Sequence, residues 1–424
     1  MRFLSAFLVL YGFAACSSGS PADEALTSND AELVSDSLKD ETAPLYCNKD
    51  VITGAARFDQ YIDLLKDKKV GVIGNQSSMI GSVHLVDTLR SLNINVVKVF
   101  SPEHGFRGDA DAGEKVASGL DSKTGLPIIS LYGKNKKPSI DQLSDVDILL
   151  FDIQDVGARF YTYISTLHYV MEAAAENNKP VIVLDRPNPN GHYVDGPVLN
   201  PKFKSFVGMH EVPVVHGMTV GEYAQMINGE GWLTSGKKCD LKVITCVGWD
   251  HTKYYELPIA PSPNLKNMTA IYLYPSLCFF EGTVVSIGRG TDFPFQVVGH
   301  PKMEVDVLEK LYKFTPMPND AAAHPVLEGQ LCYGYDLSRT DVKEYREKRK
   351  LDLSYLLEFY KKLKLGAAYF LASNFINNLA GTDQLKAQII AGKTLTEIEA
   401  SWQDGLNAFR EKRKEYLLYS DFED

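Results

Sequence analysis

Apolar runs recur along the first half of the chain, and stretches with helical spacing separate them. The strand-like runs lie at 70–75, 95–100, 127–133, 147–155 and 180–187, and the clearest helical stretches lie at 84–92 and 166–177. Because these runs show no alternation of apolar and polar positions, both faces of each strand are expected to be buried. The pattern therefore predicts an α/β fold with a Rossmann-like, doubly wound parallel sheet.

The same sheet is expected to continue past residue 200. A helix is predicted over 219–229, because Thr219 is a suitable N-cap and Glu222, three residues later, completes a capping box. A strand over 241–247 follows. Near Glu256 the sequence Leu-Pro-Ile-Ala-Pro-Ser-Pro-Asn breaks all periodicity, which indicates a domain edge.

Two domains are therefore expected. Residues 51–255 form the Rossmann-like domain, and residues 256–424 form a smaller α+β domain. The second domain begins with Tyr-rich apolar segments and ends in charged helices predicted at 353–364 and 398–416.

The first 16 residues have the layout of a secretory signal peptide, with Arg2, an apolar stretch over 3–13 and small residues before Cys16. Phe-Ala-Ala-Cys also resembles a bacterial lipoprotein cleavage site, which implies that Cys16 is lipidated. The polar residues 17–50 are then a flexible tether. We expect an exported protein, lipid-anchored in the bacterial cell envelope and facing the periplasm. The alternative is a plain signal peptide with an incidental cysteine.

Composition and charge argue against several classes of function. The chain has 424 residues and a formal net charge of -10, with no run of Lys and Arg, so nucleic acid is not an expected partner. No GxGxxG or GxxxxGK[ST] follows a strand, so no nucleotide cofactor is expected. Five cysteines follow Cys16 without a CxxC pair, which argues against a zinc knuckle and leaves at least one free, buried thiol.

Polar side chains stand where the predicted strands end, which is the edge where parallel sheets bind ligands. They are Asn75 after the first strand, Glu103 and His104 after the second, Tyr132 at the third, Gln154, Asp155 and Arg159 at the fourth, and Asp185, Arg186 and Asn188 at the fifth. Their convergence predicts an active site at this edge.

Glu103 is the candidate for a general acid. Glycoside hydrolysis requires a carboxylic acid that protonates the leaving oxygen, and usually a second carboxylate. Phe100 and Phe106 are candidates for the apolar surroundings that keep such a carboxyl protonated. In the alternative, Glu103 caps its loop or pairs with Arg107. His104 is a candidate for orienting Glu103 or for binding substrate, and the alternative is a structural hydrogen-bond donor.

The segment FDIQDVGARFYTY, at the fourth strand end, offers Asp155 as a second carboxylate and Arg159 and Tyr161 as substrate contacts. The structural alternative has Asp155 capping the next helix and Arg159 pairing with Asp152. In the second domain, PSPN contributes Asn264 and SIGRGT contributes Arg289, although both segments also fit plain turns. An arginine flanked by glycines is suited to clamp a carboxylate.

A metal site is a weaker alternative. His104, Asp109 and Asp111 lie close together in the sequence, but no HExxH is present, and Asp-rich turns are commonly solvated loops.

At these same stretches the chain resembles the exo-acting β-N-acetylmuramidases of bacterial peptidoglycan recycling. The matching segments, in family order, are SPEHGFRG, SLYG, DIQDVGARFYTY, LDRPNPNG, HGMTVGEYA, PSPN, FEG and GRGTDFPF, and the C-terminal part matches more loosely. Two departures stand out: Gly-His-Pro-Lys at 299–302 replaces the family's usual Gly-Ala-Pro-Trp, and Val284 stands where a polar residue is expected.

The resemblance implies a Rossmann-like domain and a smaller C-terminal domain with the active site in the cleft between them. It also implies release of terminal N-acetylmuramic acid from the non-reducing end of peptidoglycan fragments, with Glu103 as the catalytic acid. The segments around Asp155, Asp185, Asn264 and Arg289 would line the cleft. Because muramic acid carries a lactyl carboxylate, we expect Arg159, Arg186 or Arg289 to bind it.

Two competing hypotheses remain open at this point. The first is a non-catalytic, peptidoglycan-binding lipoprotein that uses the same cleft. The second is a metal-assisted hydrolase built on His104, Asp109 and Asp111. The identity of the second catalytic group is also open, because the 2-acetamido carbonyl of the substrate can replace a second carboxylate.

Overall fold

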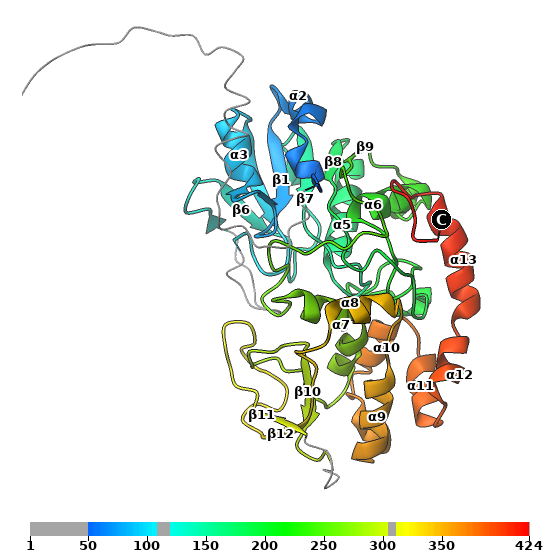
Figure 1. Ribbon diagram of the computed structural model, residues 1–424. Coiled ribbons are helices and arrows are strands. Elements are labelled where there is room, and N and C mark those ends of the chain that lie inside the picture. The colour runs from blue at the N-terminus through cyan, green and yellow to red at the C-terminus, as the bar shows by residue number, and fades with distance from the viewer. Residues whose placement is uncertain (1–49, 108–118, 304–310, 424) are drawn as a thin grey trace, which may run out of the picture. The chain divides into compact units, whose positions relative to one another are not determined.

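The computed structural model of the chain describes residues 50–107, 119–303 and 311–423 (Figure 1). The predicted signal peptide, Cys16 and nearly all of the predicted tether lie outside these residues, as do Asp109 and Asp111. No helix among the described residues is long and apolar enough to cross a membrane.

A seven-stranded sheet forms the centre of the first half of the chain (Figure 1). Its order is β5 (Gly119–Leu120), β6 (Pro127–Ser130), β4 (Val96–Ser101), β1 (Val70–Gly74), β7 (Ile148–Asp152), β8 (Val181–Leu184) and β9 (Leu241–Ile244). All neighbouring pairs from β6 to β9 are parallel, and β5 alone pairs antiparallel at the edge. The predicted parallel sheet is confirmed, including its extension by the strand after residue 240.

Both faces of this sheet are buried, as the absence of alternation predicts. In β7, Leu149 and Phe151 pack in one core with helix α5 (Tyr163–Glu176), whereas Ile148 and Leu150 pack in a second core with helix α3 (Leu85–Ser91). Successive side chains of a strand point to opposite faces, so each core receives every second residue. The strand ends are thereby held between two helical layers.

Helix α6 (Val220–Gly229) begins as predicted. Thr219 is its N-cap: its Oγ1 accepts a hydrogen bond from the Glu222 amide at 3.2 Å, and the Glu222 carboxylate accepts from the Thr219 amide at 2.8 Å. This confirms the capping box.

The second half of the chain combines a small sheet with helices. The sheet has the order β10 (Val297–His300), β12 (Cys332–Asp336) and β11 (Tyr312–Phe314), with antiparallel pairing. Helix α7 (Met268–Leu277) and the 3-10 helix Cys278–Gly282 precede it, and helix α9 (Ser354–Leu363) follows it. These elements agree with the predicted α+β composition, and the exact domain edge stays a prediction.

The helix predicted over 398–416 is wrong in one respect, because two helices occupy this stretch. They are α12 (Leu395–Ala400) and α13 (Gln403–Lys414). Between them Trp402 is buried, and its indole N–H donates a hydrogen bond to Asp195 at 3.2 Å. That anchor turns the chain between the two helices.

The remaining elements are short. The helices are α2 (Ile62–Leu65), α4 (Ile140–Leu143), α8 (Val342–Glu347), α10 (Phe375–Ala380) and α11 (Gln384–Ile390), and β2 (Met79–Ile80) pairs with β3 (Val83–His84). The four cysteines among the described residues, Cys239, Cys246, Cys278 and Cys332, are free and buried, as the odd cysteine count predicts for at least one of them.

Candidate functional site

A cavity of about 240 Å³ lies where β4, β6 and β7 end, and residues from the second half of the chain complete its wall. The first half contributes Glu103, His104, Tyr132, Phe160, Tyr161, Thr162, Tyr163, Phe206 and Val207, and the second half contributes Ser262, Asn264, Leu265, Tyr274, Glu281, Arg289, Phe295 and Phe375. Six of the sequence-predicted site residues therefore share one cavity: Glu103, His104, Tyr132, Tyr161, Asn264 and Arg289.

Glu103 is held in this cavity by hydroxyl groups. It follows β4 directly, and the Thr162 hydroxyl donates a hydrogen bond to its Oε2 at 2.8 Å. The Tyr132 hydroxyl also hydrogen-bonds to Glu103, and burial together with this carboxylate raises the pKa of Tyr132. Tyr132 thus stays protonated and donates at neutral pH. Two donors from different strand ends fix the position of one carboxyl group.

The structure departs from two expectations about the surroundings of Glu103. Arg107 binds Asp121, at 2.8 and 3.1 Å, and Asp87, at 3.4 Å, instead of pairing with Glu103. Phe100 and Phe106 are buried in the two cores of the sheet and do not line the cavity. The apolar surroundings of the cavity come instead from the rings of Phe160, Tyr161 and Tyr163, which follow β7, and from Tyr274 in α7.

His104 adopts a backbone conformation that is unusual for a residue with a side chain. Its φ is +72°, and Gly105 follows with φ of +82°. A left-handed conformation costs a non-glycine residue roughly 1–2 kcal/mol, and such strain commonly occurs at functional sites. The turn places the buried His104 ring in the cavity wall beside Glu103.

Aromatic rings form a continuous wall in this cavity. The Tyr161 ring lies 4.8 Å from Tyr163 and 5.8 Å from Tyr274, and Tyr274 lies 4.9 Å from Phe295. The hydroxyls of Tyr161 and Tyr163 both donate to the Pro261 carbonyl, at 2.8 and 3.1 Å, which ties the two halves of the chain together. Such a wall offers flat apolar faces and is suited to the C–H groups of a sugar ring.

Asn264 lines the cavity and has an acceptor without a partner among the described residues. Its side chain is 2% exposed, and its Nδ2 donates to the Ala321 carbonyl at 2.8 Å. Among the residues that the structure describes, its Oδ1 has no hydrogen-bond partner. A buried polar atom without a partner is uncommon, and a ligand N–H is a suitable donor for it.

Arg289 and Glu281 form an ion pair in the cavity wall. The Nε and Nη2 atoms of Arg289 lie 2.7 and 2.6 Å from Oε1 of Glu281, and the guanidinium lies 4.9 Å from the centre of the Phe295 ring. Glu281 is not among the site residues predicted from the sequence. The available signal was its place in the FEG segment, eight residues before an arginine that was already a candidate.

Three predicted residues lie near the cavity without lining it. Asn75 donates from Nδ2 to the Tyr163 hydroxyl at 2.9 Å, and Gln154 donates to the carbonyls of Asp155 and Pro187. Burial raises the pKa of Asp155 to about 7. One of its oxygens accepts from the Gly157 amide at 2.6 Å, and the other has no partner among the described residues.

The two other arginine candidates are occupied inside the protein. Arg159 is fully buried, and its guanidinium donates to the carbonyls of Pro197, Val212 and Leu379. The Nε and Nη2 atoms of Arg186 donate to the two carboxylate oxygens of Asp152 at 2.6 and 2.9 Å. Asp152 therefore pairs with Arg186 and not with Arg159, which was the predicted alternative.

Asp185 and Asn188 belong to a polar network that holds the C-terminal end of the chain. Asp185 accepts hydrogen bonds from Thr219, Gly221 and the Tyr419 hydroxyl, at 2.6 to 2.8 Å. Asn188 donates to the Met218 carbonyl at 2.8 Å.

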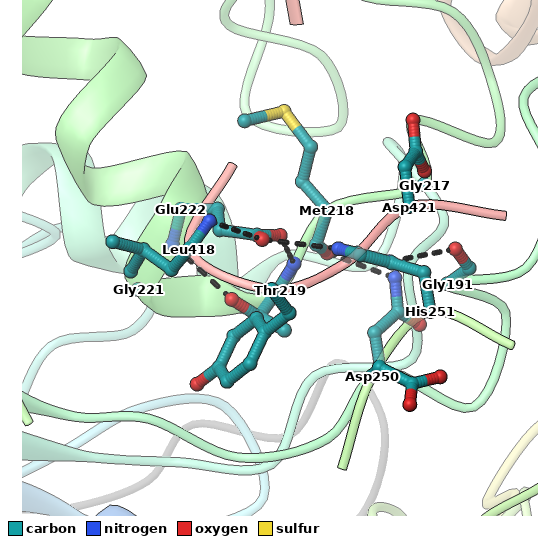
Figure 2. A network of polar contacts seen from close by, with 12 residues as sticks. Gly191, Gly217, Met218, Thr219, Gly221, Glu222, Asp250, His251, Leu418 and Asp421 are labelled. Atoms are coloured by element: carbon teal, nitrogen blue, oxygen red, sulfur yellow. Dashed lines mark hydrogen bonds and ion pairs between the residues drawn. The ribbon is translucent and has the colours of Figure 1, made fainter. Parts of the chain in front are cut away.

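Glu222 continues the same network and accepts from the Leu418 amide at 2.9 Å (Figure 2). It also lies 3.0 Å from Nε2 of His251, whose Nδ1 contacts the Gly191 carbonyl at 2.8 Å. The Tyr419 hydroxyl, which donates to Asp185 after β8, also accepts from the Cys246 amide after β9 at 2.8 Å, so residues 418 and 419 lie against the ends of both strands.

A metal site has no support among the described residues, where no group of three or more His, Cys, Asp and Glu side chains is placed to hold an ion. Two of the three proposed ligands, Asp109 and Asp111, lie outside them. The cavity contains a carboxyl group, hydroxyl donors and aromatic faces. Glycoside hydrolases use groups of these kinds to bind and cleave sugars.

Known proteins with similar sequences and structures extend over most of the chain. Peptidoglycan β-N-acetylmuramidase NamZ of Bacillus subtilis (strain 168) is 40% identical over 373 residues, which are 85% of this chain and 89% of that protein. A DUF1343 family protein of Bacteroides fragilis has a crystal structure that superposes with a TM-score of 0.81 at 48% identity, covering 88% of this chain and 99% of that chain. A second DUF1343 protein of the same species has a TM-score of 0.73 at 29% identity, with the same coverage.

Two family models match the chain one after the other. The model for the N-terminal part of exo-β-N-acetylmuramidase NamZ matches residues 70–269, and the model for its C-terminal part matches residues 272–419. Together with the identity to the Bacillus subtilis protein, these matches show that the chain belongs to the exo-β-N-acetylmuramidase NamZ family.

Proposed function

We propose that this protein is an exo-acting glycoside hydrolase that releases N-acetylmuramic acid from the non-reducing end of peptidoglycan fragments, with Glu103 as the general acid. The observation that carries the proposal is the placement of Glu103, whose carboxyl group is fixed by Thr162 and Tyr132 in a cavity walled by aromatic rings. Family membership supports the same reaction class.

In this mechanism the sugar ring lies against the aromatic wall, and Glu103 gives its proton to the glycosidic oxygen as the bond to the anomeric carbon breaks. The Thr162 and Tyr132 hydroxyls hold the carboxyl group in position before and after the transfer. His104 adjoins Glu103 and would contact the leaving group.

The group that stabilises the anomeric carbon is proposed to be the 2-acetamido carbonyl of the substrate. Asp155 has no place in the cavity wall, and Glu281 is already engaged by Arg289. The unpartnered Oδ1 of Asn264 is an acceptor for the acetamido N–H, and that contact would orient the carbonyl. Substrate assistance of this kind proceeds with net retention of configuration.

The exo-acting mode is supported by the family, because both matching models describe exo-β-N-acetylmuramidases.

The test is release of free N-acetylmuramic acid from a disaccharide in which it is β-linked to N-acetylglucosamine, by the wild type and by Glu103→Gln, each with and without a chelator. We expect turnover by the wild type, no effect of the chelator, and a loss of roughly a hundredfold or more in kcat for the variant. An inert wild type that still binds the disaccharide would favour the peptidoglycan-binding alternative. Chelator sensitivity would favour the metal-assisted one.

We also propose, from the sequence alone, that the chain is exported and lipid-anchored through Cys16, facing the periplasm. The assay is incorporation of a labelled fatty acid in the bacterial envelope by the full chain and by Cys16→Ser. Label in the wild type alone is expected, and label in neither protein would leave a plain signal peptide.

A further inference from the structure

A second cavity adjoins the first at the Glu281–Arg289 ion pair. Its volume is about 290 Å³, and three of its lining residues, Glu281, Arg289 and Phe375, also line the cavity that holds Glu103. The two cavities are therefore adjacent, and the guanidinium of Arg289 lies at their boundary.

Arg289 has hydrogen-bonding capacity left for an anion. Glu281 takes its Nε and Nη2 atoms through a single oxygen, while Nη1 has no hydrogen-bond partner among the described residues. A guanidinium carries five N–H donors, so one edge can hold Glu281 and the other a second carboxylate. Glu281 and the Phe295 ring together fix the plane of the guanidinium, so little entropy is lost on binding.

The rest of the second cavity is mostly apolar. Val285 and Ile287 are buried in its wall at 2% and 4% exposure, Phe375 stands at the junction, and Val326 is 46% exposed. The Ser286 hydroxyl, also in the wall, already accepts from the Gly288 amide. A ligand group that matches this lining has a small apolar part and one negative charge.

We propose that the second cavity is the compartment for the 3-O-lactyl group of N-acetylmuramic acid, with the lactyl methyl against the apolar wall and the free carboxylate on Arg289. The inference rests on the proposed function, because it assigns a part of the same substrate. It makes Arg289 the residue that distinguishes N-acetylmuramic acid from N-acetylglucosamine, which lacks the lactyl group.

The structure also separates Arg289 from the other two arginines considered for this role. The Arg159 guanidinium donates three hydrogen bonds to backbone carbonyls inside the protein, and Arg186 is engaged by Asp152. Neither residue lines either cavity.

The experiment compares two substrates with three proteins. The substrates are the muramyl-glucosamine disaccharide with a free lactyl carboxylate and the same disaccharide with that carboxylate converted to a methyl amide. The proteins are the wild type, Arg289→Met and Arg410→Met. Arg410 pairs with Glu423, and neither residue lines either cavity, so Arg410→Met is the matched control for loss of an arginine ion pair.

The wild type should prefer the free carboxylate by roughly tenfold to a hundredfold in kcat/KM, and Arg289→Met should abolish this preference. Arg410→Met should keep the preference. If Arg289→Met slows both substrates equally, Arg289 only positions Glu281, and the proposal is overturned.

A binding measurement separates this inference from the proposed catalysis. Free N-acetylmuramic acid and its methyl amide are titrated calorimetrically into the wild type and Arg289→Met. If the wild type hydrolyses neither substrate but binds the free acid more tightly through Arg289, the catalytic proposal fails and the lactyl compartment stands. Equal affinity of the wild type for the acid and the amide overturns the compartment.

Discussion

The buried carboxyl group of Asp155 makes a quantitative prediction about stability and pH. Burial raises its pKa from 3.8 to about 7, and only one of its oxygens has a hydrogen-bond donor among the described residues. In the unfolded chain the group ionises near its ordinary value. At pH values between these two pKa values, the folded protein keeps the proton that the unfolded chain releases. The free energy of unfolding therefore falls as the pH rises from about 4 to about 7.

Each pH unit between the two values is worth about 1.4 kcal/mol, so the ionised Asp155 costs the folded state about 4 kcal/mol above pH 7. Asp155→Asn removes that ionisation and keeps an acceptor for the Gly157 amide. We therefore expect the variant to be more stable than the wild type at pH 8 by a few kcal/mol, and the difference to shrink as the pH falls to 4.

The assay is urea unfolding of both proteins at several pH values between 4 and 8, with Asp141→Asn, at an exposed position, as the control for loss of a charge. Comparing variant with wild type cancels the other buried titrating groups. A free-energy difference that does not change with pH would refute the reasoning. Activity of Asp155→Asn should remain within about tenfold of the wild type, because Asp155 does not line the cavity. A loss of a thousandfold would show that it takes part in the chemistry.

Three further substitutions test other parts of the site. Thr162→Val removes a hydrogen bond to Glu103 and should lower kcat by roughly tenfold to a hundredfold with little change in the melting temperature, measured by disaccharide turnover and calorimetry. Asn264→Ala should raise KM for an acetamido substrate by roughly tenfold and much less for its 2-hydroxy analogue, and equal effects on both would exclude the proposed contact. Arg186→Met leaves Asp152 as an unpaired buried charge and should cost about 3–5 kcal/mol of unfolding free energy in urea titrations, whereas a cost below 1 kcal/mol would contradict the ion pair's structural role.

The sheet was predictable because its signal is local. The strands are continuous apolar runs that end in polar residues, and parallel pairing then brings those ends to one edge. Glu103 and Tyr132 follow β4 and β6, which are hydrogen-bonded neighbours, so their convergence in one cavity follows from the sheet order.

The roles of the arginines were not predictable in the same way. Arg159 and Arg186 follow strands, and Arg289 sits in a glycine-rich turn that suits it to bind a carboxylate without excluding the other two. Their roles depend on partners from distant segments, such as the Leu379 carbonyl for Arg159, 220 residues away. Glu281 was missed for a different reason, because its importance comes from the cavity that it lines and not from a strand end.

Residues 418 and 419 also set the order in which the sheet can be completed. Tyr419 supplies a donor to Asp185, and Leu418 supplies one to Glu222, so two buried carboxylates of the first half depend on residues that are translated 234 and 196 positions later. A nascent chain that stops before residue 418 holds both groups without a full set of donors, which is costly inside a protein. The β8–β9 side of the sheet therefore reaches its final state only after residues 418 and 419 have been made, and their removal damages a part of the sheet that lies more than 170 positions earlier in the sequence.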